Sequence, residues 1–230
     1  MKFIPHILYE DNHLLILEKP AGLLSQGDHT GDPNLVDLVK EYLKVKYQKP
    51  GNVYVGLVHR LDRPVSGIII LTKTSKASSR LQEQMKAGEI EKYYLAVTES
   101  HPPKEDDTLT HYLTKDEGKN KTKVYDHAKS DTKICSLYYR VLANMDGQCL
   151  LEVELQTGRS HQIRAQLAHI GCPIKGDTKY GRPATKNEND MALYAYRIVL
   201  THPVSKEVLS IVSFPQNTGY WRNLKGFFPK

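Results

Sequence analysis

The chain has 230 residues, of which 40% are hydrophobic and 25% are charged. This length allows one large domain or two lobes, and the composition excludes an intrinsically disordered chain. No apolar run approaches the roughly 18 residues that a membrane span needs, and acidic residues interrupt the N-terminus before the apolar core of a secretory signal could form. We therefore expect a single cytoplasmic domain over residues 1–230, with two lobes that share one sheet.

The net charge of +6 is compatible with a polyanionic partner such as nucleic acid but does not require one. The chain contains no acidic residue after Glu207, so its C-terminal segment is basic and aromatic. Such a segment can track phosphates and stack on bases, or it can dock on the core of the protein. Both possibilities stay open from the sequence.

The cysteine, histidine and glycine patterns indicate neither a metal site nor a nucleotide cofactor. Cys135, Cys149 and Cys172 are odd in number and far apart, which fits neither a disulfide framework nor paired metal ligands, so we expect buried thiols. The ten histidines lack convincing ligand spacing. The motifs G-x-G-x-x-G, G-x-x-x-x-G-K, H-E-x-x-H and G-x-S-x-G are all absent.

The first elements are predicted from hydrophobic spacing. Residues 14–18 form a short apolar strand, which a tight turn with Pro20 and Gly22 ends. Residues 34–47 have apolar side chains at helical spacing, and Asn34 can cap this helix.

The next segment alternates between strand and helix. The β-branched run at 67–72 predicts a strand covered on both faces. Residues 75–88 form a second helix, which Ser75 opens and Gly88 ends. Residues 92–98 follow as a strand.

The second half of the chain contains more strands than helices. The charged segment 99–133 is expected to form long surface loops or a protruding hairpin, and residues 150–157 alternate as a strand with one wet face. Ser160 can cap a third helix, and Gly171 ends it. Two final strands are expected at 197–202 and 207–214. These elements predict an α+β fold with a mixed, mainly antiparallel central sheet and flanking helices.

The segment HRLDRPVSG, residues 59–67, places Asp62 between Arg60 and Arg63. An opposite charge within about 4–6 Å lowers the pKa of a carboxyl group, so we expect Asp62 to stay ionised. An ionised aspartate can act as a nucleophile, as an electrostatic stabiliser or as half of a structural ion pair. The residues alone leave these alternatives open, and the structural ion pair is the more common arrangement.

A second basic segment, TGRSHQIR, covers residues 157–164 at the entrance of the third helix. It can be an ordinary helix start with Arg159 in solvent, or an anion site made by the helix N-terminus and Arg159. Arg164 lies beside the apolar stripe of this helix, so it needs a carboxylate partner if it is buried. Asp62 is the candidate partner, and this pair would make the two segments one site.

These residues resemble a known family. HRLDRPVSGIIIL, KYYLAV, LQTGRSHQIRAQLAHIGCPIKGDTKYG and LYAYRIVLTHPVSKE are similar to the motifs of the RluA-type pseudouridine synthases, over about residues 7 to 215. The resemblance implies the pseudouridine synthase fold with a central active-site cleft. It also implies isomerisation of uridine in tRNA or large-subunit rRNA by a monomer, without a metal or other cofactor.

The resemblance assigns roles to individual residues. Asp62 would be the nucleophile, which attacks either C1′ of the ribose or C6 of the base, and Tyr94 would stack on the extruded uracil and help to remove the C5 proton. Arg164 would orient Asp62. The residues implied in RNA binding are His59, Arg60, Arg159, Ser160, His161 and Gln162. Because a stacked uridine cannot reach a carboxylate, the base must first flip out of the RNA.

Two residues depart from the usual family pattern, namely Val65 in place of threonine and Tyr194 in place of histidine. Both are expected to tune the pocket wall or the packing of the strands rather than abolish activity. The motifs begin near residue 7, so we expect no S4-like RNA-binding domain. The alternatives are an inactive RNA-binding relative, against which the joint presence of the three expected catalytic residues argues, and a nucleoside glycosidase, which would usually need a second carboxyl group.

Overall fold

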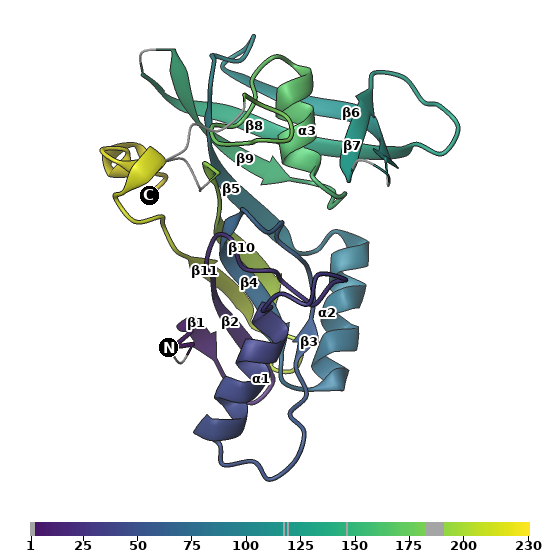
Figure 1. Cartoon of the computed structure of the whole chain (residues 1–230), viewed down its shortest axis with the longest axis vertical. Helices are drawn as coiled ribbons and strands as arrows, with labels where there is room; N and C mark the ends of the chain where they lie inside the picture. Colours follow the sequence, from purple (N-terminus) through teal and green to yellow (C-terminus); the bar gives the residue numbers. More distant parts are fainter. Residues whose placement is uncertain (1–2, 117, 119, 146, 183–190) are drawn as a thin grey trace. The chain divides into compact units, whose positions relative to one another are not determined.

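The computed structural model describes residues 3–116, 118, 120–145, 147–182 and 191–230 (Figure 1). The chain divides into two compact units. The first unit comprises Met1–Ile90 and Ala195–Ser213, and the second comprises Glu91–Tyr194 and Phe214–Lys230. Each unit has its own strands and helices and is described by itself.

The first unit is built on strands in the order β1-β2-β4-β10, with β3 paired to β4 and β11 paired to β10. Its strands are β1 (His6–Glu10), β2 (Leu14–Lys19), β3 (Gly56–Leu57), β4 (Ser66–Thr72), β10 (Leu193–Thr201, which begins in the second unit) and β11 (Val208–Val212). Its helices are α1 (Leu35–Lys46) and α2 (Ser75–Ala87). The pairs β1 with β2, β2 with β4, β3 with β4 and β10 with β11 are antiparallel.

The core of the first unit lies between its strands and α2. It consists of Leu14, Ile16, Ile68, Ile70, Leu81, Ile90, Ile198 and Leu200, all of them buried. The alternation of Leu14 with Ile16 and of Ile68 with Ile70 follows from the two-residue period of a strand. The expectation of a strand covered on both faces is confirmed for β4, in which every residue from Gly67 to Thr72 is buried.

The helix caps were predicted correctly in part. The Asn34 side chain accepts a hydrogen bond from the Asp37 backbone N–H at 3.1 Å and caps α1. The cap of α2 is Thr74, whose hydroxyl accepts from the Ala77 N–H, so the expected cap Ser75 is wrong by one residue. Gly88 ends α2 in the left-handed conformation with a φ of 75°, which a glycine adopts without a Cβ clash.

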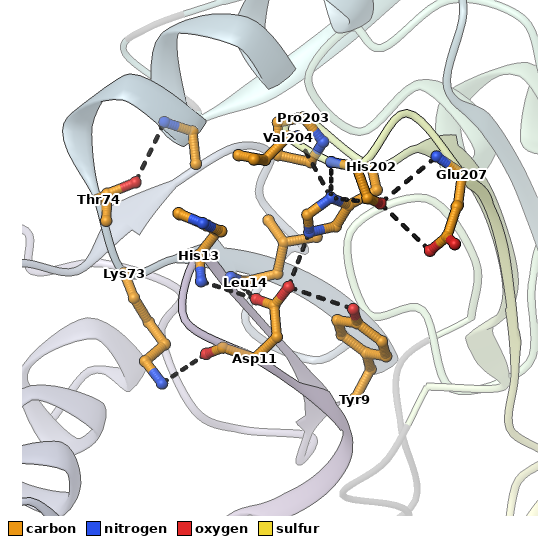
Figure 2. A network of polar contacts seen from close by, with 12 residues as sticks. Tyr9, Asp11, His13, Leu14, Lys73, Thr74, His202, Pro203, Val204 and Glu207 are labelled. Carbon is orange, nitrogen blue, oxygen red and sulfur yellow. Dashed lines mark hydrogen bonds and ion pairs between the residues drawn. The ribbon is translucent and has the colours of Figure 1, made fainter.

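A buried histidine connects the β1–β2 turn with the β10–β11 turn (Figure 2). The Nε2 atom of His202 lies 2.8 Å from the Asp11 carboxylate, and its Nδ1 atom accepts the backbone N–H groups of Val204 and Ser205. The same carboxylate accepts the backbone N–H groups of His13 and Leu14 at 2.7 and 2.6 Å. Both turns are therefore held by side-chain hydrogen bonds to their own backbone.

The second unit is built on antiparallel strands, which its described residues form in the order β5-β9-β8-β6-β7. Its strands are β5 (Glu91–Thr98), β6 (Asp106–Asp116), β7 (Lys121–Tyr125), β8 (Lys133–Met145) and β9 (Gln148–Leu155). Its helices are α3 (Gln162–His169) and the short 3-10 turns η1 (Gly219–Trp221) and η2 (Lys225–Phe227). Together the two units confirm the expected α+β class with mainly antiparallel strands.

The charged segment 99–133 contains the β6–β7 hairpin, so the hairpin alternative was correct. Leu109, His111 and Leu113 are buried and alternate with residues that are exposed or half-buried. The strand β8 was missed, although it is 13 residues long. Cys135, Leu137 and Tyr139 give it a buried face.

The C-terminal segment docks on the second unit. Trp221 and Leu224 are buried, and the Trp221 ring contacts the ring of Tyr194 edge to face at 6.2 Å. The rings of Phe214 and Phe228 are stacked at 5.2 Å. Tyr194 is buried and packs against Trp221, and the effect of this departure from the family pattern stays a prediction. The described residues contain no helix with the length and apolar character of a membrane span.

Candidate functional site

The turn that carries Asp62 is fixed by backbone and side-chain hydrogen bonds. The Asp62 carbonyl accepts the Val65 N–H at 3.0 Å, which closes the turn before β4. The Ser25 hydroxyl donates to the Leu61 carbonyl at 2.7 Å and accepts the Leu61 N–H at 3.1 Å. Leu61 is buried and Asp62 is half-buried. The buried, hydrogen-bonded Leu61 therefore holds the backbone next to the Asp62 carboxylate in place.

Lys19 supports the same turn through hydrogen bonds to backbone carbonyl oxygens. Its side chain is fully buried, and its ammonium group donates to the carbonyl oxygens of Pro20, Leu23 and Arg63 at 2.9, 2.8 and 3.2 Å. Three carbonyl acceptors satisfy all three hydrogens of an ammonium group. Burial lowers the pKa of Lys19 to about 7, while the negative charge of Asp62 raises it. Lys19 was not among the predicted site residues.

The cations around Asp62 are arranged differently from the expectation. The Arg63 guanidinium forms an ion pair with Asp32 at 2.7 Å and donates to the Gly22 carbonyl at 3.0 Å, so Arg63 closes the neighbouring loop. Arg60 is exposed. His59 is half-buried, and its Nε2 atom accepts the backbone N–H of Ile70 at 3.1 Å. Within the first unit, the buried ammonium group of Lys19 interacts electrostatically with Asp62.

We expect the stability of the protein to depend on pH through Lys19. Its pKa is about 7 in the folded protein and near 10.5 in the unfolded chain, so between these values the unfolded chain binds more protons. Relative to Lys19→Met, the wild-type free energy of unfolding should therefore rise with pH from about 7 to 10, by up to about 1.4 kcal/mol per pH unit. Urea denaturation at several pH values measures this difference. A constant difference over that range would contradict the shift, and Lys86→Met, an exposed lysine, is the control.

In the second unit, Tyr94 and the helix α3 lie on the same side of the strands. Tyr94 is opposite Val153 in the register of β5 with β9, and Val153 is opposite Tyr139 of β8. Residues that are directly opposite share a face. By the same register this face includes His111, whose ring contacts Gln166 of α3. Tyr94 is buried on the face that α3 covers.

Arg164 is buried in α3, which is the condition under which the sequence analysis required a carboxylate partner. Its guanidinium makes two hydrogen bonds to the carboxylate of Asp177, at 2.7 and 2.8 Å. The carboxylate also accepts the backbone N–H groups of Lys179 and Tyr180. Burial by itself would raise the pKa of Asp177, but these bonds, above all that from Arg164, hold the pKa below its usual value.

Asp177 was missed by the sequence analysis, which considered Asp62 as the partner of Arg164. It lies in the quoted motif KGDTKYG, and a buried arginine 13 residues away was the signal that could have found it. The expected pair of Arg164 with Asp62 involves both units and stays a prediction.

The turn before α3 is held by Gln162 and not by Ser160. The Gln162 side-chain oxygen accepts from the Thr157 hydroxyl and the Arg159 N–H at 2.7 and 3.0 Å, and its amide nitrogen donates to the Ser136 carbonyl at 3.0 Å. Ser160 is exposed and is not the N-cap, so this expectation is wrong. Gln162 is buried, and its role in this structure is to shape the turn.

His161 is the N-cap residue of α3 and has a left-handed backbone with a φ of 53°. Its Nδ1 atom lies 2.9 Å from the Tyr180 hydroxyl, which accepts the Thr122 N–H at 2.6 Å. The guanidinium of Arg164 lies 5.3 Å from the centre of the Tyr180 ring, so this ring connects the turn with the buried ion pair.

Two cations lie at this turn. Arg159 is exposed, and its Nε atom donates to the Ile134 carbonyl at 3.4 Å, which leaves most of the guanidinium toward solvent. Lys92 is buried two residues before Tyr94 and therefore shares its face. Its Nζ atom would be 3.7 Å from a Cβ atom added to Gly158, so it lies next to the turn. Burial lowers the pKa of Lys92.

Within the described part of the chain, one group of side chains could hold a metal ion: His111, Asp126 and His169, whose ligand atoms lie within 4.8 Å of one another. Gln166 donates its amide hydrogens to the Leu109 carbonyl and to Nδ1 of His111, both at 3.0 Å. Neutral His111 therefore carries its proton on Nε2, the atom that faces Asp126 at 3.7 Å. A metal ligand must be unprotonated, so this arrangement fits a hydrogen-bonded cluster better than a metal site.

The predicted cysteine environment is confirmed. Cys135, Cys149 and Cys172 are free thiols with at most 1% of their surface exposed. Burial raises the pKa of all three thiols.

The fold is that of the pseudouridine synthases. The solved structures titled human RNA pseudouridylate synthase domain containing 4 and domain containing 1 match it with TM-scores of 0.76 and 0.72, at 22% and 21% identity. The matches cover 92% and 93% of this chain and 89% and 84% of the other chains. At this identity the similarity shows the fold alone.

The sequence identifies the family. The chain belongs to the RNA pseudouridylate synthase family, whose model matches residues 13–169. It is 33% identical to ribosomal large subunit pseudouridine synthase D of Nitrosomonas europaea, over 88% of this chain and 60% of the relative. It is 34% identical to ribosomal large subunit pseudouridine synthase C of Rickettsia bellii, over 88% of this chain and 66% of the relative. The chain thus spans about two thirds or less of the length of these relatives.

Proposed function

We propose that the chain converts uridine to pseudouridine in RNA, with Asp62 as the nucleophile. The observation that carries the proposal is the family match over residues 13–169, which includes Asp62, together with the braced turn that presents this carboxylate. In the reaction the bond from C1′ to N1 breaks and the bond from C1′ to C5 forms. C5 loses a proton and N1 gains one, so the change is an isomerisation and requires no oxidant or reductant.

Asp62 begins the reaction by attack on C1′ or on C6 of the flipped uracil. Its half-buried position suits this role, because a carboxylate that is partly removed from water has fewer water molecules to lose before it attacks. The supporting residues of its turn, Ser25 and Lys19, act through the backbone and are positioning residues.

Tyr94 and Arg164 would act from the second unit. Tyr94 would stack on the uracil and assist the removal of the C5 proton. Arg164 would orient Asp62, while Asp177 holds its guanidinium in a fixed plane through two hydrogen bonds. A guanidinium held on one side by a bidentate pair still has N–H donors for a second carboxylate.

RNA would be held by basic and polar groups on both units. In this proposal His59 and Arg60 contact the RNA next to the flipped base, and Arg159, Ser160 and His161 contact phosphates at the turn before α3. Gln162 shapes that turn. Such contacts offset the few kcal/mol that flipping a base costs.

The substrate that we propose first is large-subunit ribosomal RNA. The printed names of the two relatives support it, and tRNA is the second candidate. Incubation of the protein with total RNA, followed by pseudouridine mapping, tests both the reaction and the target. New sites in ribosomal RNA are expected. RNA binding without any new pseudouridine would instead favour an inactive RNA-binding relative.

A further inference from the structure

Three lysines of the first unit lie near the ring of Tyr47, the residue that ends α1. Lys46 lies in the last turn of α1, Lys49 follows the helix, and Lys73 follows β4. Their Nζ atoms lie 5.5, 6.0 and 4.6 Å from the centre of the Tyr47 ring. We define the Tyr47 cluster as these four residues and Glu10.

Glu10 neutralises only part of this charge. Its carboxylate lies 2.7 Å from Nζ of Lys46 and 3.0 Å from Nζ of Lys73, and it accepts the Tyr47 hydroxyl at 2.5 Å. Burial would raise the pKa of Glu10, but these hydrogen bonds keep it below the usual value, so the carboxylate is charged at neutral pH. Three ammonium groups and one carboxylate leave the cluster with a charge of +2.

The cluster is anchored on one side and exposed on the other. Lys73 is the anchor, since only 12% of its side chain is exposed and it donates to the Asp11 carbonyl at 2.6 Å (Figure 2). Tyr47 is 44% exposed, the Lys46 side chain is 39% exposed, and Lys49 is exposed. The positive charge is therefore held in place and reaches solvent.

The stability of α1 explains only part of this arrangement. Cations near a helix C-terminus interact favourably with the helix dipole, which accounts for Lys46 in the last turn. Lys49 and Lys73 lie outside the helix. Each ammonium over an exposed ring is worth about 0.5–1 kcal/mol, against which the repulsion between neighbouring ammonium groups must be set. A bound polyanion would remove that repulsion.

We propose that the Tyr47 cluster is an additional RNA-binding surface, which holds phosphate groups of the substrate RNA. The inference rests on the proposed function, because RNA is the polyanion that such an enzyme meets. Flexible ammonium groups contact phosphates without regard to base sequence, so the surface would add affinity and leave the choice of uridine to other residues.

The first test removes two exposed charges. We expect Lys46→Gln/Lys49→Gln to bind a fluorescein-labelled oligouridylate of about 20 nucleotides about 25-fold more weakly at about 0.1 M salt, since each phosphate contact in single-stranded RNA contributes a salt exponent of about 0.7. The slope of log affinity against log salt should fall by about 1.4. Fluorescence anisotropy at several salt concentrations measures both quantities.

The matched control is Lys76→Gln/Lys86→Gln, which removes two exposed charges from α2 of the same unit. This variant should keep the wild-type slope and bind within about twofold of wild type, because interactions beyond about 10 Å are screened at this salt. Equal losses in the two double variants, or a wild-type slope in the first, would overturn the proposal.

A variant that makes the cluster more positive gives a second test. Glu10→Gln keeps hydrogen-bonding groups but raises the charge of the cluster from +2 to +3, so RNA binding should become tighter and the slope steeper. A purely structural cluster predicts no gain. These binding measurements do not depend on turnover, so a protein that forms no pseudouridine would refute the proposed function and leave the RNA-binding surface to be decided by the slopes.

Discussion

Asp62→Asn is expected to fold and bind RNA like the wild type but to form pseudouridine about 10⁴-fold more slowly or not at all. Removal of a nucleophile has effects of this size when the remaining groups act only with it. An amide has the shape of the carboxylate and can keep the turn before β4, yet it cannot attack C1′ or C6. Single-turnover assays with total RNA, read by pseudouridine mapping, measure the loss.

The control for this variant is Glu83→Gln, which neutralises an exposed carboxylate on α2 and should keep wild-type turnover. Melting temperatures within about 2 °C of wild type would show that both variants are folded. Turnover by Asp62→Asn within tenfold of wild type would remove Asp62 from the reaction, and the family fold would then have to use another group.

The second large effect concerns stability. Arg164→Met leaves Asp177 charged without its guanidinium, and Asp177→Asn leaves Arg164 buried without a carboxylate. Each single variant should lose about 3–5 kcal/mol of unfolding free energy, because an uncompensated charge in the interior is costly. The double variant buries neither charge, so it should lose clearly less than the sum of the two single losses. Urea denaturation of the four proteins gives the coupling.

The pH dependence of this pair has a definite sign. The pKa of Asp177 is lowered in the folded protein, so its contribution to stability is present above the ordinary aspartate pKa of about 3.9 and is lost as the pH falls through the folded value. Asp177→Asn should therefore show a weaker loss of stability in acid than the wild type. Additive single losses, with an unchanged acid dependence, would mean that the pair contributes little.

Local patterns predicted most of the fold. The helices with a clear apolar stripe and a cap, such as α1 with Asn34, were found to within a residue or two, as were strands with strict alternation such as β9. The strand β8 was missed because Tyr138, Arg140 and Asn144 interrupt its apolar residues, and only its pairing with β6 and β9 shows which face is buried.

The site shows the same limit. Motifs predict the candidate site residues, but the hydrogen-bond and ion-pair partners of these residues depend on the three-dimensional arrangement. Arg63 pairs with Asp32, 31 residues away, and the carbonyl acceptors of Lys19 include one that is 44 residues away. No spacing rule connects such residues, because the chain reverses direction between them. A sequence motif thus predicts a candidate reacting group more readily than the groups that position it.

The three buried cysteines have a practical consequence for every experiment above. A thiol-specific reagent such as Ellman's reagent reacts with an exposed thiolate. In the folded protein the three thiols are buried, and their raised pKa keeps them protonated. The rate of thiol modification should then report opening of the folded protein, in the wild type and in each variant. A cysteine introduced at an exposed position such as Ser79 could carry a dye while the native thiols remain unlabelled.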